Sequence, residues 1–165
     1  MSWALVRIDD RLIHGQVVVA WGSRMQPRRI WVADDAAAAD AWERELLAGT
    51  APGVEVRVVS IAEVAAAWET EAAAPEPAFL LVRDLAAALA LVRAGAPVRT
   101  MNIGGLHYAP GKTKVHESVY LDEHDRLQAR ALLGAGIRLD VQDVPAARPE
   151  SLVHLDPSLG GATPP

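Results

Sequence analysis

Four side chains able to do chemistry lie close together near the beginning of the sequence. Asp9, Asp10, Arg11 and His14 fall within six residues, and Gly15 follows them. A neutral imidazole nitrogen can attack phosphorus when an acceptor holds the proton on the other ring nitrogen, and either aspartate or a loop carbonyl can be that acceptor. The segment therefore favours a histidine that carries a phosphoryl group transiently.

Bound phosphoryl oxygens need hydrogen-bond donors, which the same segment also contains. Arg11 can give charge-assisted contacts, exposed amides at a helix start can bind the anion, and Gly15 lets the backbone approach a ligand closely. Since phosphoryl transfer depends mainly on positioning and electrostatics, no elaborate acid–base set is required. Two other interpretations stay open from the residues alone: a structural histidine, and a solvated turn with a local ion pair.

A second polar loop is expected at residues 102–117. Gly104 and Gly105 let the backbone turn tightly beside the first loop, and His107 and two later lysines can face phosphate or the carboxylates of a partner. For His107, a structural hydrogen bond or a docking contact is favoured over an essential role in transfer. The glycine and lysine spacing does not match a Walker A loop. The separation of the other histidines gives no zinc pattern, so no metal is predicted.

Short apolar runs separated by longer helical patterns must position these two loops. Several runs are almost continuously apolar, as strands covered on both faces require. Helix signals stand between them: a capping box at Ser60 and Glu63, capping residues Asp84 and Asp122, and a helical apolar pattern from His14 to about residue 25. The expected strands are 4–8, 29–33, 54–59, 78–82, 98–103, 118–121 and 137–141.

This alternation predicts an α/β fold: a single-domain, three-layer α/β/α arrangement with an open, mostly parallel sheet of six or seven strands and helices on both faces. Ligands of such sheets lie at the carboxyl ends of strands, near a switch in strand order, so both loops are expected at that edge. Asp34 and Asp35 follow the second strand and are candidates to line the same sheet edge, but a turn is the favoured interpretation. The domain is expected to span residues 1–145, and residues 146–165 are expected to form a poorly ordered tail.

The composition limits the classes of function. A chain of 165 residues, 51% hydrophobic, can bury the core of one domain. A net charge of -5 without any Lys/Arg-rich run gives no support for nucleic-acid binding, and no apolar stretch is long enough to span a membrane. The sequence has no cysteine, which excludes disulfides, thiolate metal sites and cysteine nucleophiles. A cytoplasmic protein is expected.

The first loop also resembles a known signature. Residues 6–17 read V-R-I-D-D-R-L-I-H-G-Q-V, which is similar to the signature of the IIB component of the mannose/fructose/sorbose family of the phosphoenolpyruvate-dependent sugar phosphotransferase system. The likeness continues in A-D-D at 33–35, in A-P-G-V at 51–54 and in M-N-I-G-G-L-H-Y-A-P-G-K-T at 101–113. The order of expected strands and helices agrees with the family from about residue 3 to residue 145.

The resemblance implies roles for particular residues. His14 would accept phosphate on Nδ1 from a phosphohistidine of the IIA component and donate it to a sugar during uptake through the membrane-embedded IIC and IID components. Asp9 would support the imidazole and Arg11 the phosphate, without a cofactor, in a protein that associates peripherally with a membrane permease. Secondary candidates in the two loops are Asp10, Leu12, Ile13, Gly15, Gln16, Gly104, Gly105 and His107.

Other functions predict features that can be compared with the sequence. A regulatory phosphohistidine module without a transport role stays open, as does the identity of the sugar. A receiver-like domain needs an acceptor aspartate after the third strand, where the sequence has Val58-Val59-Ser60. A mononucleotide- or flavin-binding module needs a phosphate-cradling glycine loop after the first strand, where glycine is sparse. Trp3 and Trp31 are candidates for a subunit contact in a homo-oligomer.

Overall fold

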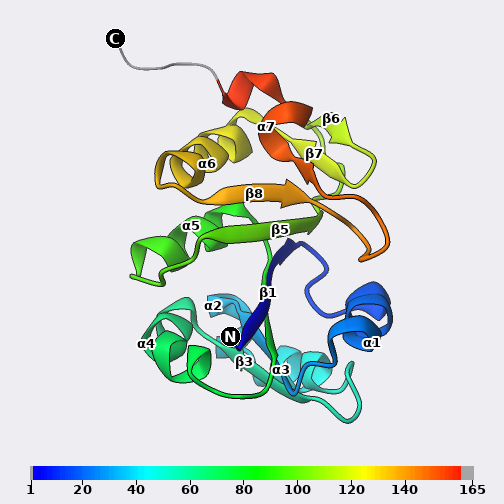
Figure 1. The fold of residues 1–165 in the computed structure, drawn as a ribbon, viewed down its shortest axis with the longest axis vertical. Helices are drawn as coiled ribbons and strands as arrows, with labels where there is room; N and C mark the ends of the chain where they lie inside the picture. Colours follow the sequence, from blue (N-terminus) through cyan, green and yellow to red (C-terminus); the bar gives the residue numbers. More distant parts are fainter. Residues whose placement is uncertain (1, 161–165) are drawn as a thin grey trace.

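A seven-stranded sheet forms the centre of the structure, a computed structural model that describes residues 2–160. The strand order is β3-β2-β4-β1-β5-β8-β9, and every neighbouring pair is parallel except β8 and β9. The strands are β1 (Trp3–Asp9), β2 (Arg29–Ala33), β3 (Glu55–Val59), β4 (Ala78–Val82), β5 (Thr100–Gly105), β8 (Arg138–Val141) and β9 (Glu150–Ser151). The predicted open, mostly parallel sheet is confirmed (Figure 1).

The two faces of the sheet carry separate hydrophobic clusters because side chains alternate along each strand. On β4, Leu80 and Val82 belong to one cluster, whereas Phe79 and Leu81 belong to the other. All residues of this strand are buried, as its continuous apolar run predicts. Helices cover both faces, and in Figure 1 α5 and α6 lie on the opposite side of the sheet from α1. The helices of the first side are α4 (Ile61–Ala72), α5 (Leu85–Arg93) and α6 (Glu123–Gly134).

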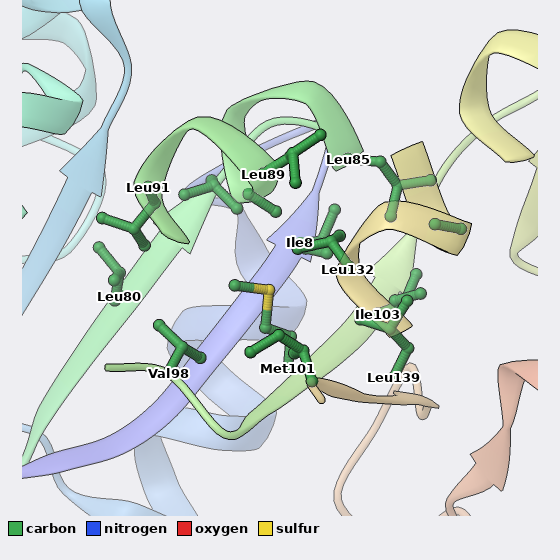
Figure 2. Packing of buried hydrophobic residues seen from close by; sticks show 14 of the residues in the cluster. Ile8, Leu80, Leu85, Leu89, Leu91, Val98, Met101, Ile103, Leu132 and Leu139 are labelled. Atoms are coloured by element: carbon green, nitrogen blue, oxygen red, sulfur yellow. The ribbon is translucent and has the colours of Figure 1, made fainter. Parts of the chain in front are cut away.

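The larger cluster fixes the central strand β1 from one side. Figure 2 shows Leu85 of α5 and Leu132 of α6 near Ile8 of β1, and all three side chains are 0% exposed. Full burial of such an aliphatic side chain contributes roughly 1.5–3 kcal/mol. Since neighbouring residues of a strand point to opposite faces, Arg7 and Asp9 extend from the other face of β1. The core thus anchors the strand from which the first polar loop starts.

The second face is covered by helices that come directly after the first loop and after β2. Val17 and Trp21 pack there with Leu5 and Phe79 in the smaller cluster. The predicted helix after His14 is present, but it begins as a π-helix, a form that is frequent at functional sites. The helical segments are η1 (Gln16–Trp21, π-helix), α1 (Gly22–Met25), α2 (Asp35–Ala39) and α3 (Ala41–Ala48).

Side-chain caps begin the helices at the predicted residues. The Ser60 Oγ accepts from the Glu63 amide at 3.2 Å, and the Glu63 carboxylate accepts from the Ser60 amide at 2.8 Å, which confirms the capping box. Asp84 accepts from the Ala87 amide at 2.8 Å and starts α5. Asp122 starts α6 in the same way. These caps satisfy amides that would otherwise lack partners at the helix ends.

The interpretation of Asp34 and Asp35 as a turn is wrong. Asp34 caps α2 by accepting from the Ala37 amide at 2.9 Å, and its other oxygen accepts from the Arg83 Nε at 2.8 Å. The helices α2 and α3 were not predicted, and the alanine-rich run that forms α2 has no apolar periodicity. The predicted strand 118–121 is also placed differently: it forms a separate antiparallel hairpin, β6 (Thr113–His116) with β7 (Val119–Leu121).

The segment after residue 145 is packed against the sheet and α6, so the expectation of a domain boundary and a poorly ordered tail there is wrong for residues 146–160. This segment forms β9, α7 (Leu152–Leu155) and the 3-10 helix η2 (Pro157–Leu159). Leu152 and Leu159 are 0% and 6% exposed, and Asp156 accepts from the Arg126 Nε at 2.7 Å. The rest of the predicted tail, residues 161–165, lies outside the described residues.

Three tryptophans pack against one another at the amino-terminal end of the sheet. Trp3 stacks on Trp68 with a centroid distance of 4.8 Å and meets Trp31 edge-on at 6.0 Å. The guanidinium of Arg57 lies over the Trp31 ring at 4.9 Å. Trp31 is 5% exposed, so the prediction that it contributes to a subunit contact is wrong: this ring is already covered within the chain.

Candidate functional site

The first polar loop starts at the carboxyl end of β1, the central strand of the sheet. Two backbone hydrogen bonds shape it: the Asp10 amide donates to the Gly105 carbonyl at 3.0 Å, and the Leu12 amide donates to the Asp9 carbonyl at 2.9 Å. Leu12 has a left-handed backbone with φ 54, an uncommon conformation for a residue with a side chain. Its side chain is 1% exposed and that of Ile13 is 4% exposed. These two buried side chains anchor the end of the loop, after its turn and just before His14.

His14 is held by Asp9. The His14 Nε2 lies 3.0 Å from the Asp9 Oδ2, and the side chains of His14 and Asp9 are 15% and 0% exposed. An ionised carboxylate can only accept, so the imidazole donates its Nε2–H to Asp9. Because this bond occupies Nε2, Nδ1 is the ring nitrogen that remains to act as a nucleophile. The residues of the loop alone left three possible acceptors open: Asp9, Asp10 and a loop carbonyl. In the structure the acceptor is Asp9.

Asp9 stays ionised although it is fully buried. Burial raises the pKa of this carboxyl group, but the hydrogen bond from His14 and the charge of Arg7 outweigh burial and lower the pKa to about 2. The Arg7 Nη2 lies 3.1 Å from the Asp9 Oδ2, and the backbone amide of Arg11 donates to the Asp9 Oδ1 at 3.1 Å. A permanently negative acceptor beside His14 is the electrostatic basis of the site.

Arg11 is the exposed cation of the loop. Its side chain is 40% exposed, its Nε donates to the Asp9 Oδ1 at 3.3 Å, and its Nη2 donates to the Gln16 Oε1 at 3.2 Å. These contacts hold the guanidinium beside the Asp9–His14 pair and leave it in reach of solvent. An exposed guanidinium can exchange such a contact for a phosphoryl oxygen, to which it binds as a charge-assisted donor.

The second loop meets the first through Asp10 and His107. The Asp10 carboxylate accepts from the His107 amide at 2.7 Å, and its other oxygen lies 2.6 Å from the His107 Nδ1. A Cβ on Gly105 would lie 3.2 Å from the His107 ring and 3.4 Å from both the Arg11 Nη2 and the Asp9 Oδ1. The glycine therefore lets three side chains from two loops approach one point, rather than making the tight turn that was predicted.

The remaining candidate residues have no hydrogen bond or ion pair with His14 among the described contacts. Gly15 has a helical backbone, and a Cβ there would meet nothing within 4 Å, so no contact within the chain requires glycine at this position, and the close approach to a ligand stays a prediction. The two lysines of the second loop pair within the chain: Lys112 with Asp125 at 2.9 Å and Lys114 with Glu117 at 2.7 Å. Among residues 2–160, no group of three or more potential ligands could hold a metal ion.

Three residues around the site were not predicted from the sequence: Arg7, Trp21 and Asn102. Arg7 is 0% exposed and contacts both Asp9 and Asn102, and Trp21 lies over its guanidinium at 5.3 Å. One signal was available, because Arg7 and Asp9 are two residues apart on an expected strand and therefore share a face. The partner on the neighbouring strand depends on the register of β1 and β5, which the sequence does not show.

Fold and site together define a parallel α/β domain with a histidine loop at the carboxyl end of its central strand. A family model described as "PTS system sorbose subfamily IIB component" matches residues 3–159. The chain belongs to this family of the sugar phosphotransferase system, so the resemblance seen in the sequence is confirmed. The receiver-like and nucleotide-binding alternatives are thereby set aside.

Similar proteins and structures agree with this assignment. The sorbose-specific EIIB component of Klebsiella pneumoniae is 37% identical over 145 residues, which cover 87% of this chain and 88% of that protein. The mannose-specific EIIAB component of Escherichia coli (strain K12) is 38% identical over 145 residues, but these cover 45% of that longer protein. The crystal structure of the IIBSor domain of the Klebsiella pneumoniae sorbose permease has a TM-score of 0.85 at 34% identity, covering 96% of this chain and 98% of that chain.

Proposed function

We propose that His14 accepts a phosphoryl group on Nδ1 from a phosphohistidine of a IIA donor and passes it to a sugar during uptake through IIC and IID membrane components. The observation that carries this proposal is the hydrogen bond between the His14 Nε2 and the buried, ionised Asp9. That bond keeps the proton on one ring nitrogen and leaves the lone pair on the other. The exposed Arg11 beside it supplies a cation for the transferred group.

The first transfer exchanges one nitrogen–phosphorus bond for another. The Nδ1 lone pair of His14 attacks phosphorus while the bond to the donor imidazole breaks, and the donor nitrogen keeps the electron pair. Phosphorylated His14 carries a positive ring as long as Nε2 keeps its proton, and the Asp9 carboxylate stabilises that charge. In the second transfer a sugar hydroxyl releases its proton to solvent, its oxygen attacks phosphorus, the bond between phosphorus and Nδ1 breaks, and Nδ1 regains its lone pair.

The site is suited to a protein donor because His14 lies on a surface loop. A cavity of about 540 Å³ opens beyond β8, but neither His14 nor Arg11 lines it. The side chain of His14 is 15% exposed and that of Arg11 is 40% exposed, so both can be reached from solvent. A donor that itself carries the phosphoryl group on a side chain needs such an open approach to Nδ1 rather than an enclosed pocket.

The partners follow from the family and are part of the proposal. The longer relatives that include a region similar to this chain are named as EIIAB components, which favours a IIA protein as the donor. In the described part of the chain, no helix is both long and apolar enough to cross a membrane. The IIC and IID components would therefore supply the sugar path, with this chain docking on their cytoplasmic side.

Phosphorylation with a purified, phosphorylated IIA protein tests the assignment of His14. His14→Ala is expected to accept no phosphate and to remain folded, with a lower free energy of unfolding because the hydrogen bond to Asp9 is lost. His124→Ala is the matched control, since His124 is an exposed histidine on α6, and it should be labelled normally. The label on the wild type should be lost in acid and kept in base, as phosphohistidine is. Labelling of His14→Ala would refute the proposal.

A further inference from the structure

Arg7 is the most deeply enclosed charged side chain next to the site. It is 0% exposed, and its two terminal nitrogens donate to the Asn102 Oδ1 at 2.6 Å, the Gln142 carbonyl at 2.9 Å, the Asp9 Oδ2 at 3.1 Å and the Asp143 carbonyl at 3.0 Å. Its Nε is buried without a hydrogen-bond partner. Burying an arginine charge is costly unless the charge is paired, and the pairing with Asp9 ties Arg7 to the site.

The route of the Arg7 side chain is built into three neighbouring strands. Arg7 is in register with Asn102 on β5, and the side chain continues across β5 to carbonyls that follow β8. It passes directly over Gly104: a Cβ at that position would lie 1.9 Å from the Arg7 Cζ. Only glycine allows this path, so the predicted importance of Gly104 has a specific cause, which is room for Arg7.

The helix that follows His14 is tied to the same place. The Trp21 indole donates to the Asp143 carbonyl at 3.0 Å, and its ring lies 5.3 Å from the Arg7 guanidinium carbon. Arg7 therefore contacts the residue before the loop, Asp9, and the helix after it, through Trp21. Both ends of the segment that carries His14 therefore contact the same buried cation, the guanidinium of Arg7.

The two arginines of the site have different tasks. All four terminal donor contacts of Arg7 are used inside the protein, whereas Arg11 is 40% exposed and has contacts that it can exchange. We propose that Arg7 is a positioning residue for phosphoryl transfer: it holds the Asp9 carboxylate against His14 and balances its charge, so that Nδ1 keeps its lone pair. This inference rests on the proposed function of His14.

The charge balance follows from the groups that face the Asp9–His14 pair. Arg7 from β1 and Arg11 from the loop contact Asp9, while Asp10 and His107 pair with each other, and Asp143 after β8 lies near Arg7. Without Arg7, the negative charge of Asp9 is less well balanced, and this can act in two ways. The carboxylate can stabilise a second proton on the His14 ring. Alternatively, Asp9 itself can become protonated and donate a hydrogen bond to Nε2, so that the single ring proton lies on Nδ1. Either outcome removes the lone pair from Nδ1.

Arg7→Gln tests this inference by two measurements. Nitrogen NMR of labelled, unphosphorylated protein reports whether the Nδ1 of His14 is free of a proton, and transfer from phosphorylated IIA reports the rate against pH. Loss of the Arg7 charge should shift the pH–rate profile to higher pH by about one unit or more. The rate at neutral pH should then fall on the order of tenfold. Arg57→Gln is the matched control, because it removes another arginine that covers a tryptophan and should change neither measurement.

Asn102→Ala provides a milder variant in case Arg7→Gln does not fold. It removes one of the four acceptors of Arg7 and keeps the guanidinium, so the His14 signals and the rate profile should shift in the same direction by a smaller amount. Wild-type nitrogen signals and a wild-type rate profile in the folded variants would overturn the role of Arg7. The nitrogen signals need no donor protein, so failure of the wild type to accept phosphate would count against the proposed function alone.

Discussion

The Asp9 carboxylate should make the stability of the protein depend on pH in a way that Asp9→Asn removes. The asparagine keeps the size of the side chain but not its charge. The structure lowers the pKa of Asp9 from 3.8 to about 2 although burial acts in the opposite direction. Since one pKa unit corresponds to about 1.4 kcal/mol, the ionised carboxylate contributes roughly 2 kcal/mol to the free energy of unfolding.

The sign of the effect follows from the lowered pKa. The unfolded chain takes up a proton on this carboxyl group as the pH falls below about 4, whereas the native state resists protonation down to about pH 2. The contribution is therefore complete above pH 4 and is lost as the pH falls from about 4 to about 2. Urea unfolding of the wild type and of Asp9→Asn at a series of pH values measures it as the difference between two curves.

A matched variant separates this effect from general acid destabilisation. Asp34, Glu71 and Asp156 also have lowered pKa values, because hydrogen bonds and arginine partners outweigh burial, and they act equally in both proteins. Glu55→Gln removes a carboxylate that is 46% exposed in an ion pair with Arg57, and exposed pairs contribute little. If the difference between wild type and Asp9→Asn does not shrink in acid, the electrostatic account of Asp9 is wrong.

Two further predictions concern the exposed cation and the carboxyl-terminal segment. Arg11→Ala should raise the barrier for transfer from phosphorylated IIA by about 2–4 kcal/mol, because it removes a charge-assisted contact to the transferred group. A wild-type rate in that variant would show that Arg11 has another task. Leu152→Ala should lower the free energy of unfolding in urea by about 2–4 kcal/mol, since the side chain is 0% exposed. An unchanged midpoint would mean that this segment is not part of the folded domain.

The first loop could be predicted because its chemistry is local. Asp9, Arg11 and His14 are close in sequence, and the apolar run before them identifies the strand that presents them. The family resemblance implies Asp9 rather than Asp10, but local chemistry alone leaves the choice open, because it depends on which carboxylate the strand turns inward. Asp10 instead pairs with His107, which is far along the chain and reaches the site only through the pairing of β1 and β5.

The errors have a common physical origin in tertiary contacts. The carboxyl-terminal segment is rich in proline and glycine, which favours disorder by composition, but Leu152 and Leu159 supply enough burial to fix it. The role of Arg7 depends on the space above Gly104 and on carbonyls beyond β8. Neither feature produces a local pattern in the sequence. The sequence alone therefore shows Arg7 only as a polar residue in a strand and Gly104 only as a glycine.

Under the proposed function, phosphoryl carriage through one nitrogen also constrains the order in which His14 meets its partners. With Nε2 bound to Asp9, donor and acceptor must visit the same side of the imidazole, so the two partners exclude each other. Under the proposed function, each cycle then includes the departure of one partner before the arrival of the next. A long-lived complex with either partner would block the next transfer step. The affinities of this chain for the donor and for the acceptor must therefore be weak enough for dissociation to keep pace with sugar uptake.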